Sequence, residues 1–289
     1  MINRMYLPLM LLILGLVAAV DPAVADIKLK QIMLDNGVKL EYRVTGPKDA
    51  PVVLMIHGVT DSGHSWTSVM PYLESSYRVY APTLRGHGDS DKPAGGYQIA
   101  GFAEDMIAFM DKLGIERASV VGHSLGSLVA HQLASVYPQR VDALALIGSA
   151  PTLVDNPVVT YLWEEIIGTD EFQDPIDPEF ILEWQTGPNP VDEEFFEIVL
   201  SETAKVPARV WKAAFRGMLT DDHRAFLDDI DTPTQIIWGD ADPLMTYDDQ
   251  TALQQAISGS TLLIYPGAGH NTHWEQPAEV AADLLNFLP

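Results

Sequence analysis

Short, mostly apolar runs alternate along this chain with longer stretches whose apolar residues recur at helical spacing. The apolar runs occupy residues 52–57, 78–81, 118–121, 141–147, 234–238 and 261–265. The helical stretches occupy residues 102–113, 125–137, 247–257 and 279–288. A short, mostly apolar run of this kind, without a polar alternation, is typical of a strand that is buried on both faces. Strands that alternate with helices predict an α/β fold, with a mostly parallel sheet covered by helices on both sides.

Two segments depart from this alternation. Residues 27–34 and 38–45 alternate apolar with polar side chains and flank Asn36-Gly37, a pair that favours a tight turn, so they predict a β-hairpin. Residues 151–215 contain seven prolines and several short amphipathic pieces, but no convincing buried strand. We therefore expect an insertion of helices between two strands of the core.

The first 25 residues are typical of a signal peptide. Arg4 is the only charge before an apolar run from Tyr6 to Val20, and Ala23-Val24-Ala25 fits the small residues of a signal-peptidase site. The run has 15 residues, fewer than the ~20 that a membrane-spanning helix needs. We predict a signal peptide at residues 1–25, a mature domain at 26–289, and export to the periplasm or the medium of a bacterium. An uncleaved membrane anchor or a buried N-terminal helix is the alternative.

Charge and cysteine content exclude several classes of function. The chain has 17 Lys and Arg against 40 Asp and Glu, a formal net charge of −23, and no cysteine. A surface this negative repels phosphate backbones and acidic lipids, so we expect no nucleic-acid partner and no stable membrane association after signal cleavage. Without cysteine there is no disulfide, no thiolate nucleophile and no cysteine-ligated zinc. The histidines show no metal-ligand spacing, so we expect neither a metal nor another cofactor.

The segment Gly122-His123-Ser124-Leu125-Gly126 carries the strongest chemical signal. It has the form G-x-S-x-G and lies between a buried strand and an apolar helix. A side chain on so sharp a strand-to-helix turn needs neighbours without a Cβ atom, which accounts for both glycines. Ser124 is then held at the positive end of the following helix, where the N–H of Leu125 can face a developing oxyanion. The pattern predicts Ser124 as a catalytic nucleophile.

A serine hydroxyl is protonated at neutral pH and needs an adjacent base. His270 follows a strand and a glycine-rich loop, which places it at the same sheet edge as Ser124. His273 is the rival, although it stands where the last helix begins and is expected to cap or pack there. The base also needs an orienting carboxylate. The segment WGDADP offers Asp242, which we prefer, and Asp240, for which a turn or capping role is the alternative.

A second oxyanion donor is expected from the loop after the strand at residues 52–57. Gly58 lets the backbone turn inward there, and the N–H of Val59 can then face the site. His57 is expected to tie loops together through hydrogen bonds. Val59 and Leu125 are therefore the predicted donors of an oxyanion hole.

Five segments together resemble the α/β-hydrolase superfamily, in particular its single-domain serine esterase, lactonase and C–C hydrolase branches. They are HGVTDSGHSW (57–66), LRGHGDSDKP (84–93), GHSLG (122–126), WGDADP (238–243) and GAGHNTHWEQP (267–277). The resemblance implies an eight-stranded sheet, a helical lid after the sixth strand at about residues 151–215, and a Ser124–Asp242–His270 triad. Thr246 departs from the family, which often has proline after the acid loop. Branches that dehalogenate or open epoxides use an aspartate nucleophile, so Ser124 argues against both.

The expected insertion is acidic and rich in aromatic residues. Between residues 141 and 204 there are fifteen Asp and Glu and no Lys or Arg. A substrate carboxylate would meet an unfavourable field there, so we expect neutral, fairly apolar small substrates rather than anionic ones.

The predicted function is a metal-independent serine hydrolase that cleaves carboxylic esters through an acyl-enzyme on Ser124. The alternatives are a lactonase or a C–C bond hydrolase with the same triad, or a non-catalytic binding protein.

Overall fold

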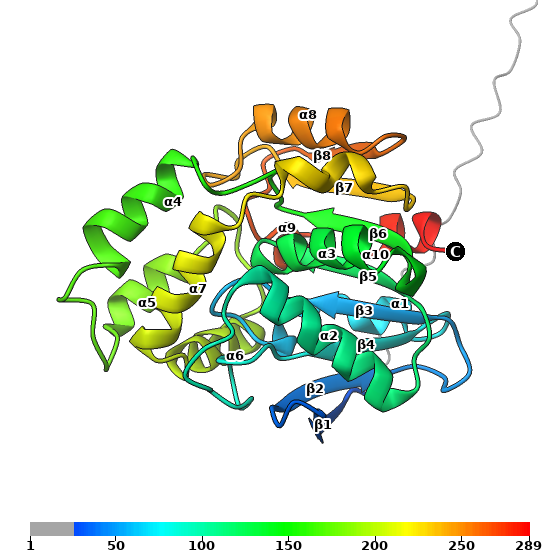
Figure 1. Ribbon diagram of the computed structural model, residues 1–289, viewed down its shortest axis with the longest axis horizontal. Coiled ribbons are helices and arrows are strands. Elements are labelled where there is room, and N and C mark those ends of the chain that lie inside the picture. The colour runs from blue at the N-terminus through cyan, green and yellow to red at the C-terminus, as the bar shows by residue number, and fades with distance from the viewer. Residues whose placement is uncertain (1–25) are drawn as a thin grey trace, which may run out of the picture.

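The protein, described here by a computed structural model of residues 26–289, is built on one eight-stranded sheet (Figure 1). The strands are β1 (Lys28–Met33), β2 (Lys39–Thr45), β3 (Val52–Ile56), β4 (Arg78–Pro82), β5 (Ala118–His123), β6 (Val141–Ile147), β7 (Thr234–Gly239) and β8 (Thr261–Tyr265). Their order across the sheet is β1-β2-β4-β3-β5-β6-β7-β8. The predicted signal peptide at residues 1–25 lies outside the described residues.

The first two strands form the predicted hairpin. They pair antiparallel, with Lys28 opposite Val44, and Gly37 in the connecting turn has a φ of +84°, a conformation that a Cβ atom would strain. β2 also pairs antiparallel with β4. All other neighbours, from β4 across the sheet to β8, are parallel. The expectation of an eight-stranded, mostly parallel sheet is therefore confirmed.

Helices connect the parallel strands and cover both faces of the sheet. The long ones are α2 (Ile99–Leu113), α3 (Leu125–Val136), α8 (Tyr247–Ala256) and α10 (Pro277–Phe287). The short ones are α1 (Met70–Leu73), α9 (Thr272–Glu275), and the 3-10 turns η1 (Gly63–Trp66), η2 (Pro138–Arg140) and η4 (Arg224–Asp229). Each long helix matches, within a few residues, a stretch of helical spacing in the sequence. Between residues 26 and 289, no helix is both long and apolar enough to cross a bilayer.

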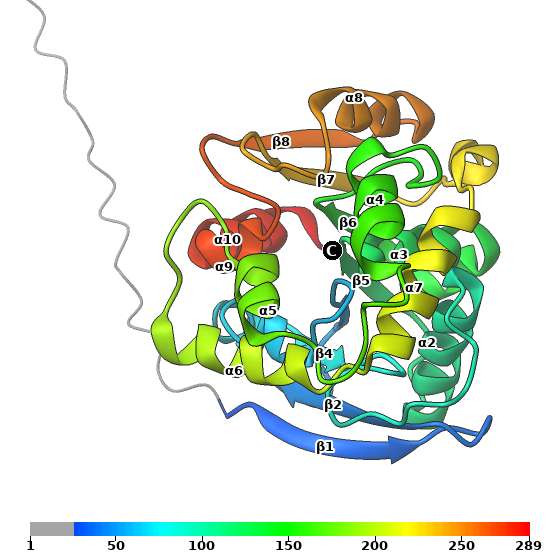
Figure 2. The same ribbon diagram turned by 90° about the vertical axis from the view of Figure 1, so that its left-hand side faces the viewer.

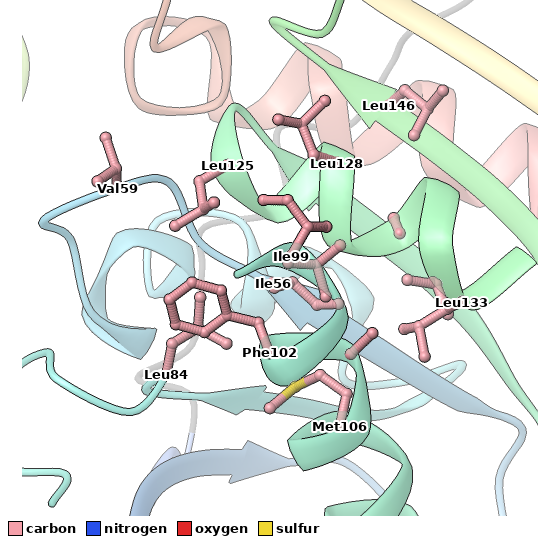
Figure 3. Packing of buried hydrophobic residues seen from close by; sticks show 14 of the residues in the cluster. Ile56, Val59, Leu84, Ile99, Phe102, Met106, Leu125, Leu128, Leu133 and Leu146 are labelled. Atoms are coloured by element: carbon pink, nitrogen blue, oxygen red, sulfur yellow. The ribbon is translucent and has the colours of Figure 1, made fainter. Parts of the chain in front are cut away.

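The buried strands contribute to two cores, one on each face of the sheet. Ile56 of β3 joins one core, together with Phe102 of α2 and Leu128 of α3 (Figure 3). Its neighbours Val53 and Met55 belong to the other core, which α1 and α10 cover. Successive side chains of a strand point to opposite faces, so a strand covered on both sides is apolar at every position. This is the physical reason why these strands appear in the sequence as mostly apolar runs.

Between β6 and β7 the chain leaves the sheet and forms a helical insertion. It comprises α4 (Pro157–Leu162), the π-helical turn η3 (Trp163–Ile167), α5 (Pro178–Gln185), α6 (Glu193–Ala204) and α7 (Ala208–Thr220). These helices lie together beyond the carboxyl ends of the parallel strands (Figure 1 and Figure 2). The last helix of the insertion, α7, ends at Thr220, a few residues beyond the expected end of the insertion near residue 215. Met218, in the last turn of α7, is still buried.

Candidate active site

Ser124 occupies the sharp turn between β5 and α3. Its φ of +51° is one that side chains rarely adopt, and its N–H donates to the carbonyl oxygen of Ile147 in β6 at 3.0 Å. A Cβ atom on Gly122 would lie 2.3 Å from the carbonyl oxygen of Gly126. One on Gly126 would lie 2.1 Å from the carbonyl oxygen of Ile56. The backbone packing around the turn therefore requires both glycines of the G-x-S-x-G pattern.

The structure brings His270 and Asp242 into contact. Nδ1 of His270 lies 2.7 Å from Oδ2 of Asp242, whose side chain is fully buried. The other carboxylate oxygen accepts the backbone N–H groups of Leu244 (2.8 Å) and Met245 (3.1 Å), which fixes its orientation. Asp240 is exposed and accepts a backbone N–H of the loop after β8 instead. Of the two aspartates, only Asp242 is placed to orient the imidazole.

Burial and charge act on His270 in opposite directions. Burial by itself lowers the pKa of the imidazole, but the charge and the hydrogen bond of Asp242 raise it, with further help from Asp61 and Glu275. The net result is a pKa above the ordinary value of 6.5. A raised pKa means a more basic ring, so the surroundings of His270 suit a general base.

Ser124 and His270 line the same cavity at the carboxyl edge of the sheet. Nε2 of His270 is buried and has no hydrogen-bond partner within residues 26–289. It is the ring nitrogen that Asp242 leaves free, and so it is the one available to take a proton. His273, the rival base, is fully buried away from the lining, and its ring packs 4.4 Å from that of Trp66.

Val59 and Leu125 come from two segments that meet at this edge of the sheet. Val59 lies on the loop after β3 and borders the cavity, and Leu125 is the first residue of α3 (Figure 3). The N–H of a first helical residue has no partner within its own helix. Both side chains belong to the same core cluster, which holds the two backbones together. His57 supports the loop as expected: its Nδ1 donates to the carbonyl oxygen of Gly58 (2.7 Å) and its Nε2 accepts the N–H of Leu84 (2.9 Å).

The cavity has a volume of about 390 Å³ and a lining of two kinds. Apolar side chains of the insertion line one part of it: Val159, Leu162, Ile166, Phe180, Phe215 and Met218. Polar side chains line the part near His270 and the loop after β3: Asp61, Gln185, Thr186 and Asn271. No Lys or Arg lines the cavity, and nowhere in residues 26–289 do three His, Asp or Glu side chains gather so that they could hold a metal ion. Such a lining favours an apolar, uncharged ligand with one polar end.

Asp61 is a site residue that the sequence patterns did not indicate. It is buried, and its Oδ1 accepts a hydrogen bond from Nε2 of Gln185 at 3.0 Å. Burial raises the pKa of this carboxyl to about 6, against the effect of that hydrogen bond. The sequence feature that could have indicated Asp61 is its position two residues after Val59, a predicted oxyanion donor. His123 supports the base in another way, since its Nε2 donates to the carbonyl oxygen of His270 at 3.1 Å.

Comparison with known proteins agrees with the fold. The sequence profile of the alpha/beta hydrolase fold matches residues 51–184 and 201–277. An uncharacterized protein of Mycobacterium tuberculosis is 32% identical over 272 residues, which cover 88% of this chain and 79% of the relative. Epoxide hydrolase A of the same organism is 29% identical over 311 residues, which cover 88% of this chain and 95% of the relative. The solved structure of an esterase from Exiguobacterium antarcticum matches in fold with a TM-score of 0.79, at 20% identity, over 89% of this chain and 98% of the esterase.

Proposed function

Because this chain belongs to the alpha/beta hydrolase fold family, we propose that it is a serine hydrolase that cleaves carboxylic esters of small, neutral, fairly apolar substrates. The observation that carries the proposal is the 2.7 Å contact between His270 and Asp242, beside a cavity that Ser124 also lines. A nucleophile, a base and an orienting acid are the three groups that acyl transfer through a serine requires.

In the proposed reaction, Ser124 attacks the ester carbonyl carbon while Nε2 of His270 takes the hydroxyl proton. Asp242 stabilises the imidazolium that forms, and the N–H groups of Val59 and Leu125 hold the oxyanion of the tetrahedral intermediate. The imidazolium then gives its proton to the departing alcohol, which leaves an acyl-enzyme on Ser124. His270 then takes a proton from a water molecule as the water attacks the acyl carbon. The second tetrahedral intermediate collapses to the free acid, and the imidazolium returns its proton to the departing oxygen of Ser124.

The two kinds of lining support one orientation of the ester. The acyl chain lies against the apolar side chains of α4, η3 and α7. The alcohol leaves past Asn271, because His270, the base that protonates it, is adjacent to Asn271. A cavity of about 390 Å³ is near the small end of the roughly 300–1,000 Å³ that ligand sites occupy, so short and medium acyl chains are preferred. Asp61 and Glu183, with no cation in the lining, disfavour carboxylate substrates.

Epoxide opening is the main competing reaction, because an epoxide hydrolase is among the relatives. Epoxide-opening branches of this superfamily carry an aspartate at the turn where this chain has Ser124. A serine favours acyl transfer. A lactonase performs the same steps on a cyclic ester, so lactones belong in any substrate panel. C–C cleavage of acidic substrates is disfavoured by the charges at the cavity.

Active-site labelling and turnover test the proposal together. A fluorophosphonate probe should label Ser124 rapidly, and the protein should hydrolyse p-nitrophenyl butyrate. Ser124→Ala should abolish both reactions. A folded wild-type protein that neither takes the label nor cleaves any ester or lactone would be a binding protein, and the proposal would be wrong. Epoxide turnover that survives in Ser124→Ala would overturn it in favour of the competing reaction.

The acid is tested by a matched pair of substitutions. Asp242→Asn keeps the shape of the side chain but can no longer stabilise the imidazolium, so kcat should fall on the order of 10³- to 10⁴-fold. Asp240→Asn should leave most of the activity, because Asp240 only accepts a backbone N–H in an exposed loop. If Asp240→Asn were the more damaging change, Asp242 would not be the acid.

A further inference from the structure

The loop that carries Val59 has a strained backbone at the next residue. Thr60 has a φ of +71°, in the left-handed region that disfavours side chains, and β-branched ones most of all. Among the non-glycine residues of 26–289, only Thr60 and Ser124 have a positive φ. Strain of this kind persists only where surrounding contacts hold it. Both instances lie at the candidate active site.

Two consecutive residues of α5 hydrogen-bond two consecutive residues of this loop. Nε1 of Trp184 donates to Oγ1 of Thr60 at 2.9 Å, and Nε2 of Gln185 donates to Oδ1 of Asp61 at 3.0 Å. Thr60 and Asp61 are buried, so both acceptors are largely shielded from bulk water. Nε2 of Gln185 also donates to Oγ1 of Thr203 in α6 at 2.7 Å, so a second helix of the insertion fixes the amide.

Asp61 also restrains Gly58, the residue on the other side of Val59. Its backbone N–H donates to the carbonyl oxygen of Gly58 at 3.3 Å, and its carboxylate accepts a hydrogen bond from the hydroxyl of Ser65 at 3.4 Å. Contacts on both sides therefore restrain the peptide that presents the Val59 N–H. A Cβ atom on Gly58 would lie 2.8 Å from Nδ1 of His123, so the loop is packed tightly against β5 as well.

Trp184 also lines the cavity. Its ring packs against those of Trp211 and Phe215 in α7, with centroids 5.3 Å and 5.8 Å apart. The side chain that holds Thr60 is therefore also within reach of a ligand in the cavity. Trp211 belongs to this aromatic cluster but not to the cavity lining, and its Nε1 donates to the carbonyl oxygen of Val206 at 3.1 Å.

We infer that Trp184 and Gln185 are positioning residues for the oxyanion hole. They hold the strained backbone of Thr60 and Asp61 in the form that turns the Val59 N–H into the site. The oxyanion hole therefore has its active geometry only when α5 is packed on this loop. The inference rests on the proposed hydrolase function, and it assigns the helical insertion a part in catalysis besides forming the cavity wall.

Trp184→Phe removes the indole N–H and keeps an aromatic ring in the cavity wall. We expect kcat for p-nitrophenyl butyrate to fall roughly 10- to 100-fold, less than the 10²–10³ that loss of a whole oxyanion donor costs, with little change in KM. Trp211→Phe is the matched control, because it removes another indole N–H of the same cluster without touching the loop, and it should keep its kcat. A raised KM with unchanged kcat in Trp184→Phe would show that the indole only binds substrate, and the inference would be wrong.

Two substitutions of Thr60 separate backbone strain from loss of the hydroxyl group. Thr60→Ala removes the acceptor for Trp184 but keeps a Cβ atom, so the left-handed backbone stays strained. Thr60→Gly removes the same acceptor and the strain, because glycine adopts a positive φ without penalty. We expect the kcat of Thr60→Gly to exceed that of Thr60→Ala several-fold. Equal values, or a lower value for Thr60→Gly, would contradict the inference.

The same assays distinguish a failure of this inference from a failure of the proposed function. If the wild-type protein neither cleaves esters nor takes the fluorophosphonate label, both are overturned. If the wild type is active and Trp184→Phe behaves like Trp211→Phe, only the inference is overturned. Thermal unfolding shows whether each variant is folded at the assay temperature. If Trp184→Phe is not folded, the comparison of Thr60→Gly with Thr60→Ala tests the inference instead, because neither substitution changes the insertion.

Discussion

At the scale of single residues, a 2.7 Å hydrogen bond to the carboxylate of Asp242 distinguishes His270 from the other histidines of the chain. Burial lowers the pKa of the other seven: His57, His64, His87, His123, His131, His223 and His273. Burial acts on His270 as well, but Asp242 outweighs it and the pKa is raised. A buried histidine without such a partner stays neutral and packs, whereas His270 is equipped to hold a proton during a reaction.

The charge of Asp61 is expected to affect the pH dependence of catalysis. His270 must be neutral to act as a base, so kcat/KM falls as the pH drops through its pKa. Asp61 contributes to raising that pKa, and Asp61→Asn removes the charge while keeping an oxygen that can accept from Gln185. The acid limb of the kcat/KM profile should therefore move to lower pH in Asp61→Asn. A limb that stays in place or moves to higher pH would show that Asp61 does not act on His270 through its charge.

At the scale of elements, β3, β5 and α3 meet at Gly126 without spare volume. A Cβ atom there would lie 2.1 Å from the carbonyl oxygen of Ile56, so Gly126→Ala should force the helix away from the sheet. We expect a loss of about 1–3 kcal/mol in the free energy of unfolding, together with loss of activity. Gly95→Ala is the control, because a Cβ atom at Gly95 meets nothing within 4 Å. Urea unfolding of the two variants checks this, and equal midpoints would contradict it.

Thr246, which stands where the family often has proline, caps α8. The side chain of Thr246 accepts the N–H of Asp249 at 3.2 Å, and the Asp249 carboxylate accepts the N–H of Thr246 at 2.7 Å. This reciprocal capping box needs an N–H that proline lacks. The loop that carries Asp242 is thus followed directly by a capped helix.

At the scale of the whole molecule, the buried histidines predict sensitivity to acid. Burial lowers the pKa values of His64, His87 and His223 from 6.5 to about 4. The unfolded chain then binds protons at a higher pH than the folded protein, so stability present above pH 6.5 is lost as the pH falls toward 4. The loss is about 1.4 kcal/mol per pH unit for each histidine at most. Asp61, Glu41 and His270 oppose this loss, because their pKa values are raised in the folded protein. These three groups are fewer than the seven histidines whose pKa values are lowered.

Urea unfolding checks this expectation directly. The midpoint should be lower at about pH 5 than at about pH 7. High salt is needed in both measurements, because acid also relieves the self-repulsion of a chain with a formal net charge of −23. A midpoint that is unchanged or higher at the lower pH would show that the histidines do not control acid stability.

We propose that residues 1–25 direct export and are then removed. Expressed with this segment in a bacterial host, the protein should reach the periplasm, and its mass should correspond to a chain that begins at Asp26. A full-length protein in the membrane fraction would instead support an uncleaved anchor.

The sequence by itself determined those features that depend on neighbours along the chain. The hairpin with its Asn36-Gly37 turn, the buried strands and the turn at Ser124 all follow from local backbone sterics and from periodic burial. These act within a few residues and leave a pattern in the sequence. The eight-stranded sheet follows from the same alternation, with the family resemblance supplying the number of strands.

Only the tertiary structure decided which side chains converge on the site. Asp240 and Asp242 stand two residues apart with nearly equal local signals, and it is the position of His270 across the sheet edge that separates them. Likewise, nothing near Thr60 in the sequence indicates Trp184, because their hydrogen bond exists only once the helical insertion has folded over the sheet. Contacts of this kind depend on the relative placement of distant segments, and that placement is set by the packing of the whole core rather than by any local pattern.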